Sequence, residues 1–490
     1  MLVDLQVGDL TEPLTGRSWT RHEVTAQIFQ RIDVYVDRGV GQGDRVFFFH
    51  GNNLDFFADL IAVWHLGACA IPIDSRLTSF EVENLARTVK PRFALIDSTL
   101  NKKNMNALSA LNVALLNTQF LERSISKPNA DSRPLSVGRL DDEALILFTS
   151  GSTGSPKGVV HTHRSLRARW AALRECLGVE SYQRTLCLLP THFGHGLICN
   201  CLFPWFSGQH LFIAPPFSTD LLMQLGRLID RHKITFLSSV PSMWALTLKA
   251  SKPPQAKSLR RIHCGSAPLS AHLWRQIQDW AGIQKVFNAY GITETGSWVA
   301  GTTIGEFEPA DGLVGVPWGA VIKILKSDRP AALFDHDAQC RVDEAGYVWL
   351  NTPALMQGYF AQRELTDQVV CNDWFLTGDM GFIDERGWFY LKGRERDEIN
   401  KGGTKIYPID IEAVVEKFEY AESVCTFAVA DPLYGQNVAM AVVLKRQDAA
   451  AIQALHRWMK EHLADFKMPQ RWYVVDALPQ NSRGKVSRQV

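Results

Sequence analysis

The feature that most constrains this chain is an apolar run that leads directly into a loop of small hydroxyl and glycine residues. Residues 145–148 read LILF, and residues 149–158 read TSGSTGSPKG. A buried strand followed by such a loop presents many backbone N–H and hydroxyl donors, which predicts a triphosphate-binding loop. It is not a Walker P-loop, because Pro156 precedes Lys157 and Gly158 follows it. The alternative, a flexible linker, rarely follows an apolar strand directly.

Composition excludes several other classes of function. Lys and Arg total 52 and Asp and Glu total 51, so the net charge of +1 argues against a surface for nucleic acid or acidic membranes. The nine cysteines are scattered and lack CxxC spacing, which indicates reduced thiols. Residues 1–10 do not resemble a signal peptide, and the apolar window 196–217 is interrupted by Pro204 and polar residues. We therefore expect a cytoplasmic protein without a membrane span.

Periodicity predicts an α/β fold with two domains. Helical patterns at 220–233 and 269–280 each precede a strand-like run, at 234–237 and 285–287, as in helix-covered parallel sheets. Near Gly393 a charged cluster begins. A helix at 409–418, strands at 424–429 and 438–444, a helix at 449–463 and a strand at 472–475 are predicted beyond it. The predicted domains are residues 1–393 and a smaller α+β unit, residues 394–490.

Three further groups of polar residues are weak signals alone. Residues 288–296 (NAYGITETG) place a hydroxyl and a carboxylate just after a strand, where they can reach a phosphate and Mg²⁺. Residues 375–379 (FLTGD) and Arg394 supply a carboxylate and a guanidinium suited to hydroxyl or phosphate oxygens. Lys485 lies on a glycine-flanked loop near the end of the chain. Each has an ordinary alternative as a solvated turn.

Together, the four groups occur in the order and approximate spacing of the adenylate-forming superfamily, which the chain resembles over nearly its whole length. That superfamily includes acyl- and aryl-CoA synthetases, adenylation domains of peptide synthetases and beetle luciferases. Residues 264–269, 315–317 and 356–359 also match its motifs. The resemblance implies a large N-terminal domain of helix-covered sheets that holds ATP and the acid, and a small mobile C-terminal domain.

The resemblance also implies roles for individual residues. The catalytic residues are Lys485, Thr293, Glu294 and Lys157, with Glu294 also holding Mg²⁺. The ATP-binding residues are Thr149, Ser150, Gly151, Ser152, Thr153, Gly154, Gly265, Ser266, Ala267, Asn288, Tyr290, Gly291, Asp379 and Arg394. Asp379 and Arg394 are expected at the ribose, and Thr293 at the α-phosphate. Arg396 is the implied hinge, and Gly402 and Gly403 line the implied thiol tunnel.

The implied reaction joins a carboxylic acid to a thiol with ATP and Mg²⁺. The acid becomes an acyl-adenylate as pyrophosphate leaves, and the acyl group then passes to a thiol. CoA is the favoured acceptor, but an acyl carrier protein presents the same phosphopantetheine arm, so a carrier-loading enzyme is the alternative. A catalytically degenerate adenylate-binding protein is disfavoured, because Lys157, Glu294, Asp379, Arg394 and Lys485 are all present.

The acid pocket is implied by residues 189–197 (LPTHFGHGL). Its candidates are His192, Phe193, His195, Val240, Ser242 and Trp298, with Ser266 beside them. Phe193 stands where many members carry a histidine, and either neighbouring histidine has a structural alternative. No aspartate occurs between residues 186 and 209 to pair with an α-ammonium group. This favours a carboxylic acid without an amino group as the substrate. Trp298 either shortens the pocket or belongs to the core. Gly346-Tyr347 replaces the family's common Gly-Glu, with a structural effect expected.

Overall fold

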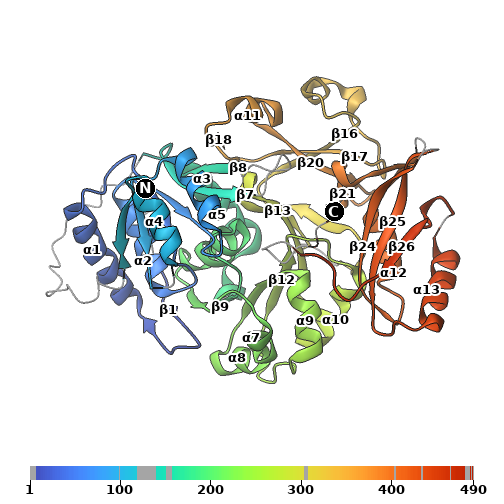
Figure 1. Ribbon diagram of the computed structural model, residues 1–490, viewed down its shortest axis with the longest axis horizontal. Coiled ribbons are helices and arrows are strands. Elements are labelled where there is room, and N and C mark those ends of the chain that lie inside the picture. The colour runs from blue at the N-terminus through green and yellow to red at the C-terminus, as the bar shows by residue number, and fades with distance from the viewer. Residues whose placement is uncertain are drawn as a thin grey trace.

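The computed structural model describes residues 7–98, 100–118, 139–149, 157–302, 307–401, 404–431, 434–463, 465–480, 486 and 488. Its strands form three sheets. Two sheets and the helices that cover them make up a large N-terminal part, and the third belongs to a small C-terminal part on the right of Figure 1. The predicted α/β class, with a large N-terminal and a small C-terminal domain, is confirmed.

The largest sheet runs through the centre of the molecule. Its spatial order is β16 (Val321–Leu325), β17 (Gly346–Asn351), β20 (Trp374–Ile383), β21 (Phe389–Arg394), β15 (Leu313–Pro317), β14 (Ser297–Gly301), β13 (Val286–Ile292), β12 (Arg261–Gly265), β11 (Phe236–Ser239), β9 (Arg184–Cys187), β10 (His210–Ile213), β1 (Leu10–Thr11) and β2 (Ser18–Trp19), with β19 (Val370–Cys371) beside β20. From β13 to β1 the strands are parallel, and β14 turns back antiparallel. The polar residues predicted after β13 therefore lie at the point where the parallel part ends.

The second sheet carries the strand that leads into the predicted phosphate loop. Its order is β18 (Gly358–Tyr359), β8 (Lys157–Thr162), β7 (Glu143–Thr149), β4 (Cys69–Pro72), β3 (Arg45–Phe48), β5 (Phe93–Ile96) and β6 (Ala114–Asn117). β7 and β8 form an antiparallel pair in which Thr149 lies opposite Lys157. The two ends of the predicted loop are thus adjacent.

Helices cover these two sheets, and several begin with the residues expected at helix starts. They are α1 (Arg21–Asp37), α2 (Leu54–His65), α3 (Ser79–Val89), α4 (Lys102–Ala110), α5 (His163–Leu177), α6 (Phe203–Trp205), α7 (Thr219–Met223), α8 (Leu225–His232), α9 (Pro241–Ala250), α10 (Ala271–Ala281) and α11 (Arg363–Val369). Thr20 and Thr78 form capping boxes with Glu23 and Glu81. Every residue of α2 is buried except Asp55, as expected of a helix enclosed within the core.

The predicted elements correspond closely to the observed ones, with one difference. The predicted helix at 269–280 is α10, and the strand predicted at 285–287 is β13. The strand predicted at 234–237 is β11, which begins two residues later than predicted. The single helix predicted at 220–233 is instead two helices, α7 and α8. Gln224 has φ −102° and ψ 1° and leaves the helical conformation between them. Gly226 then packs against the Lys252 carbonyl so closely that a Cβ would lie 2.1 Å from its oxygen.

The small domain follows the predicted order of elements and has its own core. It contains β22 (Ile399–Lys401), β23 (Thr404–Ile406), α12 (Pro408–Val415), β24 (Ala421–Asp431), β25 (Gly435–Leu444), α13 (Ala449–His462) and β26 (Arg471–Val474). Ile411 from α12, Val442 from β25 and Leu455 from α13 meet in one hydrophobic cluster, each fully buried. This core is separate from those of the large domain.

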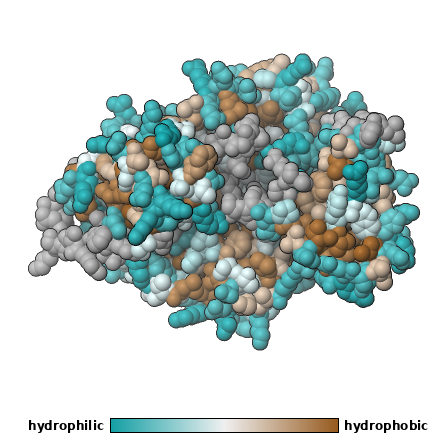
Figure 2. All heavy atoms as spheres, in the orientation of Figure 1, coloured by the Kyte–Doolittle hydropathy of each residue, from teal (hydrophilic) through white to brown (hydrophobic). Residues whose placement is uncertain are grey.

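The surface carries no single apolar face on the side drawn in Figure 2, where hydrophobic residues form several separate patches among hydrophilic ones. Within the described residues, no helix is long and apolar enough to cross a membrane. The apolar window at 196–217 folds into the π-helical segment η3 (His195–Leu202), α6 and β10. All nine cysteines are free thiols, and Cys199 and Cys264 are among the buried ones.

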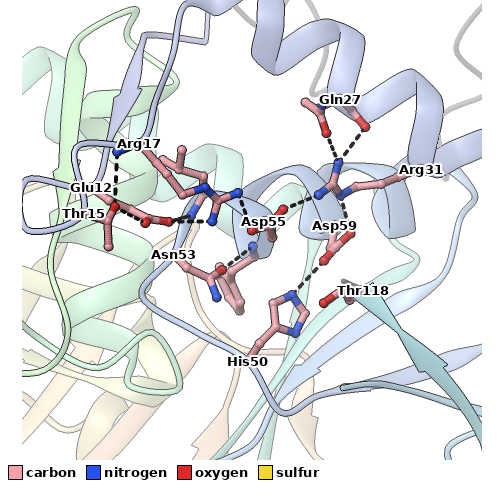
Figure 3. Close-up of polar contacts among 12 residues, drawn as sticks. Glu12, Thr15, Arg17, Gln27, Arg31, His50, Asn53, Asp55, Asp59 and Thr118 are labelled. Carbon is pink, nitrogen blue, oxygen red and sulfur yellow. Dashed lines mark hydrogen bonds and ion pairs between the residues drawn. The ribbon is translucent and has the colours of Figure 1, made fainter. Parts of the chain in front are cut away.

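A buried network of charges joins α1 to α2 (Figure 3). The Arg31 guanidinium donates to Asp59 at 2.7 Å and to Asp55 at 2.5 Å. Asp59 is fully buried and also accepts from Tyr35 and His50 at 2.6 and 2.7 Å. Burial raises the pKa of Asp59, but Arg31 and these hydrogen bonds outweigh it and hold the pKa below its usual value. The carboxylate is thus ionised and fully paired in the core.

Replacing Asp59 by Ala should destabilise the protein by about 3–5 kcal/mol, because it removes a buried carboxylate and leaves Arg31 with one acidic partner. Chemical denaturation of the purified protein measures the change. Asp141→Ala, which removes an exposed ion pair with Arg164, is the matched control and should leave the midpoint nearly unchanged. Equal shifts for the two variants would contradict the assigned role.

Candidate active site

The centre of the site is the turn between β13 and β14, which carries Thr293 and Glu294. The turn is the 3₁₀ segment η4 (Thr293–Thr295), and Gly296 ends it with φ 70°, a left-handed conformation that favours glycine. Gly291 lies so close to the opposite strand that a Cβ would be 2.0 Å from the Ser297 carbonyl oxygen. The glycines quoted with this motif therefore allow the tight hairpin that presents Thr293 and Glu294.

Contacts to Glu294 link this turn to the end of the predicted phosphate loop. Tyr359 donates its hydroxyl proton to the Glu294 carboxylate at 2.8 Å, and the Met356 N–H donates to the Glu294 carbonyl at 2.7 Å. The Lys157 ammonium lies 5.2 Å from the centre of the Tyr359 ring. Burial and the Glu294 charge raise the pKa of Tyr359, so its hydroxyl remains a donor. The structure thus brings Lys157 and Glu294 to the same place.

Asp379 and Arg394 form an ion pair at the junction between β20 and β21. The Arg394 guanidinium lies 2.8 Å from one Asp379 oxygen, and the Tyr290 hydroxyl donates to the other at 2.5 Å. Asp379 raises the pKa of Arg394, as does the nearby Glu294 carboxylate. Only 2% of Asp379 is exposed. The Arg394 and Tyr290 contacts therefore fix the orientation of the Asp379 carboxylate.

The ends of β12 and β13 bring together the other predicted nucleotide residues. A Cβ on Gly265 would lie 2.2 Å from the Ala289 carbonyl oxygen, and Ser266 follows with φ 66°. Ala267 is partly exposed beside it. Asn288 is buried and donates to the Leu313 carbonyl at 2.7 Å. Asn288 therefore fixes the neighbouring strands, while Ser266 and Ala267 form the partly exposed turn.

The predicted acid-pocket residues have different surroundings in the structure. His195 bridges two serines: its Nδ1 lies 2.7 Å from the Ser266 hydroxyl and its Nε2 lies 2.6 Å from the Ser238 hydroxyl. Trp298 packs against the His195 ring at 5.4 Å. Phe193 is buried, and His192 instead lies 3.5 Å from Asp74. Val240 and Ser242 lie at the N-terminus of α9, with Val240 buried and Ser242 partly exposed.

A clamp from the second sheet positions the acid-pocket loop. Asn52, which has φ 46°, donates from its side chain to the carbonyls of Leu189 and Ala214, both at 2.9 Å. Its side-chain oxygen accepts from the Thr191 N–H at 3.0 Å. Asn52 follows His50 of the buried charge network by two residues. The network between α1 and α2 therefore supports the loop that carries His192 to His195.

Some predicted residues lie outside the described part of the structure. These are Ser150, Gly151, Ser152, Thr153, Gly154, Gly402, Gly403 and Lys485. Thr149 and Lys157, which flank the predicted loop, are described and partly exposed. Arg396 lies in the exposed turn η7 (Glu395–Asp397), directly after β21.

Arg169 is a buried residue of the site that sequence reasoning missed. It lies on α5, has no exposed surface, and donates to the Thr295 carbonyl at 3.0 Å, the Trp318 carbonyl at 2.8 Å and the Thr352 hydroxyl at 3.1 Å. Burial lowers the pKa of Arg169 to about 10, so it remains charged at pH 7. It fixes the C-terminal end of the Thr293 turn.

His161 fixes the other end of the same turn, and sequence reasoning missed it as well. Its Nε2 lies 2.8 Å from the Thr293 carbonyl oxygen, and its Nδ1 lies 3.2 Å from the Ser165 hydroxyl. Burial lowers the pKa of His161 to about 4, so the ring is neutral. Because a carbonyl oxygen only accepts, Nε2 carries the proton, and the unprotonated Nδ1 faces the Ser165 hydroxyl, which also lies 3.1 Å from the Thr162 carbonyl oxygen. No motif marks His161, since the contact spans 132 residues.

The small domain contacts the large one through polar side chains. Lys417 lies 2.9 Å from Asp311, and Lys249 pairs with Glu422. Glu416 accepts a hydrogen bond from Ser270, and burial raises the pKa of Glu416 to about 7. Ser270 is also the N-cap of α10.

Replacing Asp379 by Ala should weaken nucleotide binding by about 1–3 kcal/mol, because a buried carboxylate that accepts hydroxyl donors is lost. Calorimetric titration with Mg-ATP measures the change. Tyr290→Phe removes only one hydrogen bond to the same carboxylate, and it should cause a smaller loss. An unchanged affinity for Mg-ATP in Asp379→Ala would show that Asp379 does not bind the nucleotide.

Comparison with known proteins agrees with this geometry. The model for the AMP-binding enzyme family matches residues 8–360, and the model for its C-terminal domain matches residues 410–485. The chain is 28% identical to a 2-succinylbenzoate–CoA ligase from Geobacillus kaustophilus, over 96% of this chain and 92% of the relative. It is 27% identical to an oxalate–CoA ligase from Arabidopsis thaliana, over 93% of this chain and 89% of the relative.

Solved structures support the fold over nearly the whole chain. The o-succinylbenzoate CoA synthetase from Bacillus subtilis, in complex with its acyl-adenylate intermediate, aligns with a TM-score of 0.82 at 25% identity, covering 99% of this chain and 95% of that one. ATP-bound MatB from Rhodopseudomonas palustris aligns with a TM-score of 0.86 at 23% identity, covering 99% and 96%. The chain therefore belongs to the AMP-binding enzyme family, which confirms the resemblance to adenylate-forming enzymes and the prediction of an AMP-forming ligase.

Proposed function

We propose that this protein activates a carboxylic acid with ATP and transfers the acyl group to CoA. The observation that carries the proposal is the meeting of Lys157, Glu294 and Arg394. Tyr359 contacts both Lys157 and Glu294, and the Glu294 carboxylate raises the pKa of Arg394. Attack of a carboxylate on an α-phosphate places negative charge on phosphoryl oxygens, so catalysis requires positioned cations and donors and no protein nucleophile. This cluster supplies both.

In this proposal, different residues bind different parts of the nucleotide. Thr149 and Lys157 stand at the mouth of the predicted loop, and residues 150–154 complete the β- and γ-phosphate site. Thr293 donates to the α-phosphate, and Asp379 accepts from the ribose hydroxyls with Arg394 beside it. Residues 265–267, followed along the sheet by Tyr290 and Gly291, border the base. The close backbone approach at Gly265 supports a narrow slot there.

The Glu294 carboxylate suits Mg²⁺, which takes oxygen ligands and commonly shares them with a nucleotide. Held by this carboxylate, Mg²⁺ would supply positive charge next to the phosphate oxygens. Tyr359 orients the carboxylate by donating to one of its oxygens, and the Met356 N–H fixes the backbone beneath it. His161 and Arg169 hold the two ends of the turn, so Thr293 and Glu294 face the nucleotide together.

The small domain completes the site in this proposal. The boundary lies at residues 393/394, where β21 leaves the large sheet and η7 leads into β22 of the small one. Arg396 in that turn is the hinge. Lys485 bridges the acid carboxylate and the α-phosphate in the first half-reaction, and Gly402 and Gly403 line the thiol tunnel in the second.

CoA is the proposed acceptor because the relatives named above are CoA ligases. A carrier protein with a phosphopantetheine arm is the alternative acceptor, and those relatives do not favour it. We place the enzyme in the cytoplasm, where buried thiols such as Cys199 and Cys264 remain reduced.

Pyrophosphate release with Mg-ATP across fatty, aryl and amino acids tests the reaction and the acceptor. Each acid is assayed with CoA, without it, and with a phosphopantetheinylated carrier protein. We expect sustained turnover only with CoA, and the non-amino acids should be preferred. Acyl transfer to the carrier protein but not to CoA would identify the carrier protein as the acceptor. The absence of pyrophosphate release with every acid would refute acid activation.

Lys485→Ala should nearly abolish adenylate formation while leaving thiol transfer to a supplied acyl-adenylate largely intact, because the lysine serves only the first half-reaction. Pyrophosphate release and thioester formation are measured separately. Arg488→Ala provides a control from the same terminal segment, because Arg488 pairs with Glu412 inside the small domain. Equal losses in both half-reactions for Lys485→Ala would contradict the assigned role.

A further inference from the structure

The turn η7 joins two segments that are fixed to different domains. Before the turn, Arg394 pairs with Asp379 on β20 at 2.8 Å, and the Tyr347 hydroxyl on β17 donates to Glu395 at 3.2 Å. Both of these partners belong to the large sheet. After the turn, Ile399 is fully buried in the hydrophobic cluster of the small domain. A swing of the small domain therefore turns about the few residues between Glu395 and Ile399.

One carboxylate beyond this turn pairs with a lysine from each domain. Asp410 lies in the first turn of α12, which packs against β21. Its Oδ1 accepts from the Lys392 ammonium on β21, and its Oδ2 accepts from the Lys467 ammonium in η8 (Asp465–Lys467), each at 3.0 Å. Lys392 stays with the large sheet when the small domain turns about η7, whereas Lys467 moves together with Asp410.

The ion pair that crosses the turn is partly shielded from water. The side chains of Lys392 and Asp410 are 29% and 23% exposed, and both are less exposed than their counterparts in the Lys417–Asp311 pair between the domains. Water and dissolved ions weaken exposed pairs most. Asp410 also lies at the N-terminal end of α12, where the helix dipole favours a negative charge. The Lys392–Asp410 pair is therefore suited to hold the small domain in the orientation of this structure.

We propose that the Lys392–Asp410 ion pair is a latch, which favours one of the two domain orientations and breaks when the small domain turns to the other. The inference rests on the proposed hinge and on the two proposed half-reactions. Because the pair stabilises one orientation only, it sets the ratio of the two populations, and with it the ratio of the rates of the two half-reactions. Lys392 and Asp410 are positioning residues, since they act through the placement of the small domain.

The two lysines beside Asp410 offer a matched pair of variants. Each ammonium lies 3.0 Å from this carboxylate. Lys392 lies 5.6 Å from the centre of the Phe382 ring, and Lys467 lies 6.0 Å from that of Phe466. Methionine keeps an unbranched apolar side chain and removes the charge. Lys392→Met therefore removes the bond that crosses the turn, and Lys467→Met removes the equivalent bond inside the small domain.

The test measures pyrophosphate release without CoA, and acyl transfer from a supplied acyl-adenylate to CoA, with the best acid of the panel above. We expect Lys392→Met to change the ratio of the two rates about threefold, because one orientation loses the stabilisation of a partly exposed ion pair. Lys467→Met should leave the ratio unchanged, and so should Lys392→Arg, which keeps the charge. An unchanged ratio in Lys392→Met, or the same change in Lys467→Met, would overturn the inference.

Limited proteolysis provides a readout that does not depend on activity. Arg396 in η7 is exposed, and trypsin cleaves after arginine. Because the latch restrains this turn, Lys392→Met should speed cleavage after Arg396 about threefold in the ligand-free protein, and Lys467→Met should not. Equal cleavage of the wild type and Lys392→Met would contradict the latch. If the wild type releases no pyrophosphate with any acid, the proposed function fails, and proteolysis still tests the latch.

Discussion

The buried guanidinium of Arg169 is the interaction on which the centre of this enzyme depends. A buried ionised group is costly unless it is hydrogen-bonded, and here the guanidinium donates to two backbone carbonyls and one hydroxyl within the described part of the chain. Those acceptors come from the Thr293 turn, the residue after β15 and the residue after β17. One side chain thus sets the spacing of three segments that are distant in sequence, and the turn between them carries Thr293 and Glu294.

The same site shows how two sheets cooperate. β8, which carries Lys157 and His161, belongs to the second sheet, and the Thr293–Thr295 turn belongs to the first; the contacts of Tyr359 and His161 are among those that join them. In the proposed reaction, the second sheet therefore supplies the Lys157 cation and the first supplies the Glu294 carboxylate. The Asn52 clamp adds a third link, since it ties the acid loop to the end of β3. Pre-organisation of this kind reduces the reorganisation that accompanies charge movement.

Local patterns in the sequence were sufficient for most elements and for the family. α10, α12, α13 and the strands of the small domain follow from periodicity. The motifs at 149–158, 288–296 and 375–379 identified the family, whereas their roles toward the nucleotide stay predictions. The break at Gln224 did not follow, because it accompanies packing of Gly226 against a segment 26 residues later. His161 on β8 and Arg169 on α5 could not be found for the same reason: a polar residue within a strand or helix pattern gives no indication of which distant carbonyl it meets.

The attachment of the small domain has a consequence for the energy of its movement. Lys417 and Asp311 are about half and a quarter exposed (45% and 27%), and Lys249 and Glu422 are more exposed still (51% and 36%). Water and dissolved ions compete with such pairs, so each holds the domains together only weakly. Glu416, whose pKa lies near 7, exchanges its charge at little cost at the same interface. Contacts of this kind resemble those of a transient complex more than those of a core, and higher ionic strength weakens them further.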